Sequence, residues 1–152
     1  MNIQFIIASQ TGTAQDAAED AAEAFAEAGF PVNLVDLAML EDVNFLKEAD
    51  FILGAVSTWG EGEPPDDAVP FFEALKAAPP LGLDGTPSAI LALGDTGYDL
   101  FCECGKELER ELIRHGGEMA VPRVDCDVWF DDELKGWIKN VLEAFESSAI
   151  AR

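Results

Sequence analysis

The chain has 152 residues, the length of one ordinary domain, and 49% of them are apolar, enough for a buried core. It carries 30 Asp and Glu residues against 9 Lys and Arg, a formal net charge of −21. This charge argues against binding to nucleic acid, whose phosphates it would repel, and against anionic membrane surfaces. It favours fast, salt-sensitive docking to a basic protein surface, although solubility or adaptation to salt would also select acidic residues.

The sequence predicts a cytoplasmic protein without membrane insertion. No apolar run is long enough to span a bilayer, and the N-terminus has no basic region followed by a long apolar stretch. The three cysteines are an odd number without metal-ligand spacing, so we expect free thiols and no metal. Cys102 and Cys104, two residues apart in a predicted helix, are expected on different faces of it.

The first element is an apolar strand over residues 2–8, and a helix follows over residues 14–29. Between them, residues 9–14 form a turn of small and hydroxyl-bearing residues. Such a turn points backbone N–H groups and the positive end of a helix dipole at one spot, which suits an anion such as phosphate. It contains no Lys or Arg and matches neither the Walker nor the dinucleotide signature, and helix capping alone would also explain it.

The rest of the chain continues the alternation of strands and helices. A parallel sheet with helices on both faces follows from it, in one domain over 1–146 with a flexible tail over 147–152. The expected strands are 31–37, 51–56, 88–93 and 118–124, and the expected helices are 41–49, 66–77 (capped by Asp66 or Asp67), 100–115 and 131–146.

Three loops of unusual sequence, 9–14, 57–66 and 94–102, are expected to gather at the carboxyl edge of this sheet, where strand order reverses and ligands bind. Trp59 and Tyr98 stand next to glycines on two of them, so they could hold a flat heteroaromatic ring between them, or fold back on the core. The single histidine, His115, lies at a predicted helix end, where we expect it to meet the helix dipole or solvent.

The three loops resemble, in this order, those of the FMN-binding flavodoxin family. The matching stretches are Ser9-Gln10-Thr11-Gly12-Thr13-Ala14, Ser57-Thr58-Trp59-Gly60-Glu61-Gly62-Glu63-Pro64-Pro65-Asp66 and Leu93-Gly94-Asp95-Thr96-Gly97-Tyr98-Asp99-Leu100-Phe101-Cys102. The chain looks most like the branch found in diflavin reductases, especially the flavoprotein subunit of sulfite reductase, and like small free-standing carriers. The resemblance, which extends to about Phe145, implies an α/β flavodoxin-like three-layer sandwich with a five-stranded parallel sheet in the order 2-1-3-4-5. Residues 118–124 leave no room for the insertion of long-chain members, so it implies a short-chain flavodoxin.

The resemblance also implies noncovalently bound FMN and the residues that hold it. The first loop would seat the phosphate, the second would line the isoalloxazine with Trp59 over one face, and the third would place Tyr98 on the other face. The implied cofactor-binding residues are Ser9, Gln10, Thr11, Gly12, Thr13, Ala14, Thr58, Trp59, Gly60, Glu61, Gly62, Leu93, Gly94, Asp95, Tyr98, Phe101, Cys102, Asp125 and Asp127.

The function that follows is electron transfer rather than catalysis by the chain itself. Negative charge close to a flavin disfavours its anionic reduced form, so we expect a low-potential, one-electron carrier without catalytic residues. Its partners would be basic-surfaced redox proteins, an NADPH-dependent flavin reductase as donor and a metallo- or haem protein as acceptor, and the carrier a monomer. The expected acidic rim comprises Glu61, Glu63, Asp66, Asp67, Asp95, Asp99, Glu103, Asp125 and Asp127.

Three alternatives remain at this point. The chain could be the excised FMN domain of a longer diflavin reductase, or an FMN-dependent reductase of a small molecule such as a quinone. A phospho-acceptor receiver domain has a similar topology but needs clustered acidic residues after the first strand. Ala8-Ser9-Gln10 supplies none, which disfavours the receiver.

Overall fold

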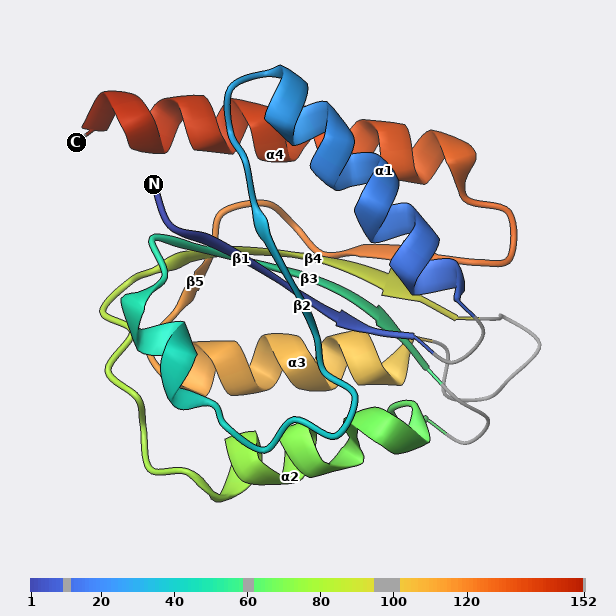
Figure 1. Cartoon of the computed structure of the whole chain (residues 1–152), viewed down its shortest axis with the longest axis vertical. Helices are drawn as coiled ribbons and strands as arrows, with labels where there is room; N and C mark the ends of the chain where they lie inside the picture. Colours follow the sequence, from blue (N-terminus) through green and yellow to red (C-terminus); the bar gives the residue numbers. More distant parts are fainter. Residues whose placement is uncertain (10–11, 59–61, 95–101, 152) are drawn as a thin grey trace.

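The computed structural model describes residues 1–9, 12–58, 62–94 and 102–151, in which strands and helices alternate (Figure 1). The strands are β1 (Ile3–Ala8), β2 (Asn33–Asp36), β3 (Phe51–Ser57), β4 (Pro87–Leu93), β5 (Glu118–Met119) and β6 (Val124–Cys126). The α-helices are α1 (Thr13–Glu27), α2 (Val69–Ala77), α3 (Glu103–Arg114) and α4 (Asp131–Ala151), joined by the short 3-10 helices η1 (Asn44–Glu48) and η2 (Asp66–Ala68).

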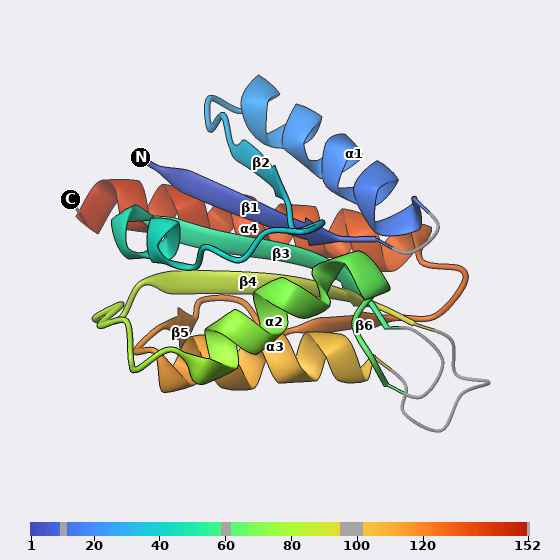
Figure 2. The same cartoon turned by 60° about the horizontal axis from the view of Figure 1, so that its bottom comes forward.

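The strands form one parallel sheet in the order β2-β1-β3-β4-β5, with β6 also paired to β4. Helices α1 and α4 cover one face, and α2 and α3 cover the other (Figures 1 and 2). This arrangement confirms the predicted three-layer sandwich and its strand order. Within the described ranges, no helix combines the length and apolar character needed to cross a membrane.

The sheet separates two buried cores because successive residues of a strand point to opposite faces. Phe5 of β1 packs toward α1 and α4, with its ring centroid 5.8 Å from that of Trp137. The next residue, Ile6, belongs to the core under α2 and α3, together with Phe72 and Leu108. The central strands therefore read as continuous apolar runs, which is why their positions could be predicted closely.

The fifth strand is not continuous, in contrast to the prediction for residues 118–124. It consists of two short segments, β5 and β6, separated by residues 120–123. Pro122 has no N–H to donate to a strand ladder, and Val121 turns into the α1–α4 core at 2% exposure. The interruption is only four residues long, so it leaves no room for the insertion expected of long-chain members.

Three helices differ in extent from the prediction. The helix expected over residues 41–49 is shorter and is the 3-10 helix η1. The Asp42 carboxylate accepts the N–H of Asn44, the first residue of η1, at 2.9 Å. Helix α2 begins at Val69, after η2, with Pro70 in its first turn. Helix α4 continues to Ala151, beyond the expected end at residue 146.

His115 is fully buried rather than solvent-exposed. It caps the C-terminus of α3, where its Nδ1 accepts the N–H of Leu81 at 2.9 Å and its Nε2 lies 2.9 Å from the carbonyl oxygen of Leu75. The ring thereby ties α3 to the end of α2, a structural role. Cys102 and Cys104 also differ from expectation: α3 starts at Glu103, and both thiols lie in the core beneath α2 and α3.

The packing of α3 on the sheet requires a glycine, which gives a direct test. A Cβ at Gly105 would lie 2.3 Å from the Cβ of Ala92 in β4, whereas a Cβ at Gly136 in α4 would meet nothing within 4 Å. Both substitutions by alanine gain the same helix propensity. We expect Gly136→Ala to raise the free energy of unfolding by roughly 1 kcal/mol and Gly105→Ala to lower it by about 1–3 kcal/mol, measured by urea denaturation. Equal gains in both variants would contradict the close contact.

Candidate functional site

The carboxyl ends of β1, β3, β4 and β6 meet at one edge of the sheet, the edge at which the three loops were expected to gather. The register pairs Ala8 with Val56 and Ser57 with Leu93, so the chain segments that follow start side by side. Cys126, the last residue of β6, pairs with Leu93. Figure 2 shows these strand ends at the side of the molecule where α1 begins. The strand order reverses between β1 and β3, where open α/β sheets bind ligands.

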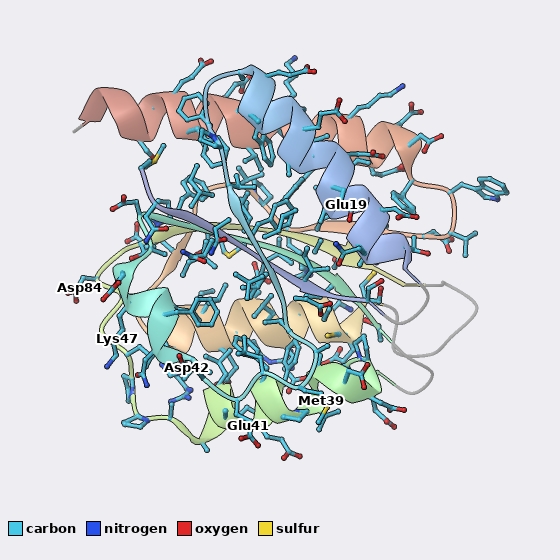
Figure 3. The ribbon with its side chains drawn as sticks, viewed as in Figure 1. Glu19, Met39, Glu41, Asp42, Lys47 and Asp84 are labelled. Carbon is cyan, nitrogen blue, oxygen red and sulfur yellow. The ribbon has the colours of Figure 1, made fainter. Side chains whose placement is uncertain are left out.

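The loop after β2 reaches the same edge. The N–H of Met39 donates to the carbonyl oxygen of Asp67 at 2.7 Å, which fastens this loop to η2. In Figure 3, Met39 lies close to the first turn of α2. Met39 is 73% exposed and has a φ of 58°, so this loop adds an apolar side chain to the edge of the site.

The first loop offers a polar atom without a protein partner. The hydroxyl oxygen of Ser9 is buried and makes no hydrogen bond within the described residues. Gly12, the residue directly before α1, has a φ of 90°, a left-handed conformation that suits glycine. The buried Ala14 holds the first turn of α1 against the sheet, so the positive end of the helix dipole is fixed beside Ser9. Thr13 opens α1 and its side chain is exposed; Gln10 and Thr11 lie outside the described residues.

Hydrogen bonds join the second and third loops at their bases. The backbone N–H of Thr58 donates to Leu93 O at 3.0 Å, and its Oγ1 accepts the N–H of Cys104, in the first turn of α3, at 2.9 Å. The N–H of Gly94 donates to Cys126 O at 3.0 Å. Thr58 thus spans the two loops, a role the sequence did not suggest. The predictions for Trp59, Gly60, Glu61, Asp95, Tyr98 and Phe101 fall outside the described residues, while Gly62 is buried with a φ of 95°.

Cys102 fixes the end of the third loop. It is fully buried, precedes α3 with a φ of 54°, and its Sγ lies 3.4 Å from Ala92 O and 3.6 Å from Cys126 O. Burial, with a smaller contribution from Asp125, raises the pKa of the Cys102 thiol to about 12. Burial likewise raises the pKa of Cys126 to about 12 and raises that of Cys104. These free thiols are therefore protonated at neutral pH and act as packing groups.

The acidic turn predicted beside the site contains a cation that the sequence analysis missed. Arg123 Nε donates to Asp125 Oδ1 at 2.7 Å, and its guanidinium also contacts Glu109 of α3. The hydrogen bond to Asp125 raises the pKa of the Arg123 guanidinium. Their spacing of two residues along an extended segment places both side chains on one side, which could have signalled the pair. Asp127 accepts the N–H of Val128 at 2.8 Å.

The remaining carboxylates of the expected rim lie in or next to the second and third loops. Glu63, Asp66 and Asp67 are exposed around η2, and Glu103 pairs with Arg110 at 3.2 Å. The predictions for Glu61, Asp95 and Asp99 fall outside the described ranges. The part of the chain that the structure describes holds no group of three or more His, Cys, Asp or Glu side chains suited to a metal ion.

The fold is that of a doubly wound α/β domain whose strand order reverses between β1 and β3. A family model described as Flavodoxin matches residues 6–137. The sulfite reductase (NADPH) flavoprotein alpha-component of Bacillus subtilis is 38% identical over 146 residues, which cover 96% of this chain and 24% of that protein. The chain thus spans about a quarter of the length of this relative.

Solved structures agree with this match. The flavodoxin of Streptococcus pneumonia TIGR4 is 26% identical with a TM-score of 0.81, and the match covers 100% of both chains. A short-chain flavodoxin associated with a PDU bacterial microcompartment has a TM-score of 0.82 at 18% identity over 98% of this chain and 99% of that one, a likeness of fold alone. The chain belongs to the flavodoxin family, whose members are typically FMN-binding electron carriers.

The role of Thr58 can be tested by a pair of substitutions. Thr58→Val keeps the shape of the side chain but leaves the N–H of Cys104 without its acceptor, whereas Thr58→Ser keeps the acceptor. We expect the valine variant to lose about 1–3 kcal/mol of unfolding free energy and the serine variant to lose well under half of that. Urea denaturation measures both, and a valine variant as stable as the wild type, or a serine variant that loses more than the valine variant, would contradict a stabilising hydrogen bond.

The buried thiols predict a stability that falls at alkaline pH. Unfolded thiols lose their protons near pH 8.5, whereas burial keeps folded Cys102 and Cys126 protonated until about pH 12. The unfolded state therefore binds fewer protons in this window, and the free energy of unfolding decreases as pH rises through it. A Cys126→Ala variant should show a shallower decrease in denaturation experiments. At pH 8 a thiol-reactive dye should label the native protein only as it unfolds, and rapid labelling would contradict this account.

Proposed function

We propose that this chain binds FMN at the carboxyl edge of its sheet and carries electrons one at a time, at low potential, from a basic-surfaced reductase to a redox acceptor protein. FMN, when bound, supplies the redox chemistry. The observation that carries the proposal is the buried Ser9 hydroxyl, which has no hydrogen-bond partner among the described residues and lies between the end of β1 and the start of α1, at the switch point of a flavodoxin-family sheet.

The residues of the first loop fit a phosphate group. The Ser9 hydroxyl can donate a hydrogen bond, and the N-terminal turn of α1 adds a positive dipole. Gly12, with its φ of 90°, lets the backbone turn directly into the helix. We propose that Gln10, Thr11 and Thr13 complete this seat, as the family resemblance implies, and that the donors are neutral throughout.

The charge of the edge supports a low potential. Glu63, Asp66 and Asp67 are exposed on the second loop, and the chain has a net charge of −21. These negative charges would repel the negative charge that a bound flavin gains on reduction, so reduction to an anionic form is disfavoured. The same carboxylates would steer a basic partner toward the edge.

The family resemblance suggests the donor and the acceptor. We propose an NADPH-dependent flavin reductase as donor and a metallo- or haem protein as acceptor, each with a basic contact face that complements the acidic edge. A second candidate is that the same site works as the FMN module of a longer reductase. It is favoured by the match to a quarter of the B. subtilis sulfite reductase flavoprotein.

Two serines with buried, unpartnered hydroxyls provide a matched test. Ser9 lies at the carboxyl end of β1, and Ser88 lies near the amino end of β4, away from the site. Replacing either by alanine removes a buried hydroxyl without a partner, so both variants should raise the stability of the FMN-free protein by about 1 kcal/mol. Only Ser9→Ala should weaken FMN binding, by roughly 10- to 100-fold, as expected for a hydrogen bond to a charged group.

Flavin fluorescence titration and urea denaturation of the FMN-free protein give the two readouts. Ser88→Ala should keep the wild-type affinity within about twofold. Wild-type affinity in Ser9→Ala would place the phosphate elsewhere, and a wild-type protein that ignores added FMN would refute the proposal. Stepwise photoreduction of the loaded protein should take up its two electrons in separate steps.

A further inference from the structure

The connection from β6 to α4 carries an apolar surface that the flavin site does not explain. Trp129 is 88% exposed and its neighbour Val128 is 57% exposed, although tryptophan is a residue type that folding usually buries. Both sides of this connection are fixed. Cys126 is buried at the end of β6, and Phe130 packs against the core under α1 and α4 while its carbonyl accepts the N–H of Leu134 at 2.9 Å. The fold therefore holds these two side chains outward.

The connection stands at the edge of the sheet that forms the site. Cys126 O accepts the N–H of Gly94, at the base of the third loop, at 3.0 Å. Trp129 follows Cys126 by three residues, a length of chain that spans at most roughly 10 Å. Figures 1 and 2 both show this connection at the end of the molecule where α1 begins. A protein that binds Trp129 would thus lie near Gly94, at the base of the third loop.

Acidic residues surround the two apolar side chains. Asp127 precedes them, and Asp131, Asp132 and Glu133 follow in the exposed first turn of α4. The helix dipole accounts for carboxylates at this position, but it gives no reason for an exposed indole. A second copy of this chain is a poor occupant because each copy carries a net charge of −21. The surface is complementary to a basic protein face instead.

We propose that these residues form a docking surface for a redox protein whose contact face carries Lys or Arg around an apolar patch. The Trp129 surface, as we name it, comprises Asp127, Val128, Trp129, Asp131, Asp132 and Glu133. The indole supplies a large apolar contact and a π face for a cation, and tryptophan is enriched among residues that dominate binding energy. The carboxylates steer and orient the partner. This inference rests on the proposed function and names the part of the edge that holds the partner.

Ferric cytochrome c, a basic haem protein, serves as the probe. The variants are Trp129→Ala, Trp129→Phe and Ile113→Ala, the last a control at a 54% exposed apolar residue near the far end of α3. Surface plasmon resonance at low ionic strength gives the dissociation constants. We expect Trp129→Ala to weaken binding by at least about fivefold, Trp129→Phe to retain most of the affinity, and Ile113→Ala to leave it unchanged. Because no charge changes, the dependence of log affinity on log salt should keep its slope in all variants.

Each other outcome would overturn the inference. Equal affinity of Trp129→Ala and the wild type would show that the indole does not bind the partner. Self-association in sedimentation that Trp129→Ala abolishes would assign the surface to a second copy. A changed FMN affinity in Trp129→Ala would make the indole part of the cofactor site. The docking assay needs no flavin, so a wild type that fails to bind FMN would refute the proposed function while the docking result stands on its own.

Discussion

The contact between Gly105 and Ala92 sets the depth at which α3 packs on β4, and the site depends on that depth. Only a residue without a Cβ fits there, because an added Cβ would lie 2.3 Å from that of Ala92. At this depth the N–H of Cys104 reaches Thr58 Oγ1, and the Cys102 thiol reaches the carbonyl of Ala92. The base of the second loop and the end of the third loop are therefore both held by hydrogen bonds that depend on the packing of α3 on β4. The positions of their bases follow from helix packing rather than from the loops themselves.

The charges of the chain are unevenly balanced. Four glutamates of α3 pair with Lys76, Arg110, Arg114 and Arg123, and Arg123 also pairs with Asp125. Arg123 engages Asp125, so the acidic turn beside the site is partly neutralised. The exposed carboxylates around η2 and in the first turn of α4 flank the site edge on two sides. Glu63, Asp66 and Asp67 around η2, and Asp131, Asp132 and Glu133 of α4, appear in none of these pairs, so their charges contribute to the negative field at this edge.

The sequence was sufficient for the layers and strand order, because buried strands and amphipathic helices leave strong local patterns and the loop motifs add the topology. It was insufficient where a residue's conformation or burial depends on contacts with residues far away in the chain. The break at Pro122 depends on Val121 turning into the core, and the burial of His115 depends on contacts with Leu75 and Leu81, more than thirty positions away. The bridge from Thr58 to Cys104 is equally nonlocal. The positions of Trp59 and Tyr98 stay predictions, since both lie outside the described residues.

A phosphate seat made of neutral donors suits a chain with a net charge of −21. Under the proposed function, a lysine at the first loop would attract the phosphate more strongly, but it would also weaken the negative field that selects the partner and lowers the potential. A buried hydroxyl and a helix N-terminus act only at short range, so they hold the phosphate without changing that field. Under the same proposal, the Ser9 hydroxyl, which has no partner among the described residues, costs the FMN-free protein about 1 kcal/mol. A bound phosphate would accept a hydrogen bond from this hydroxyl and remove the cost, so FMN binding would stabilise the fold.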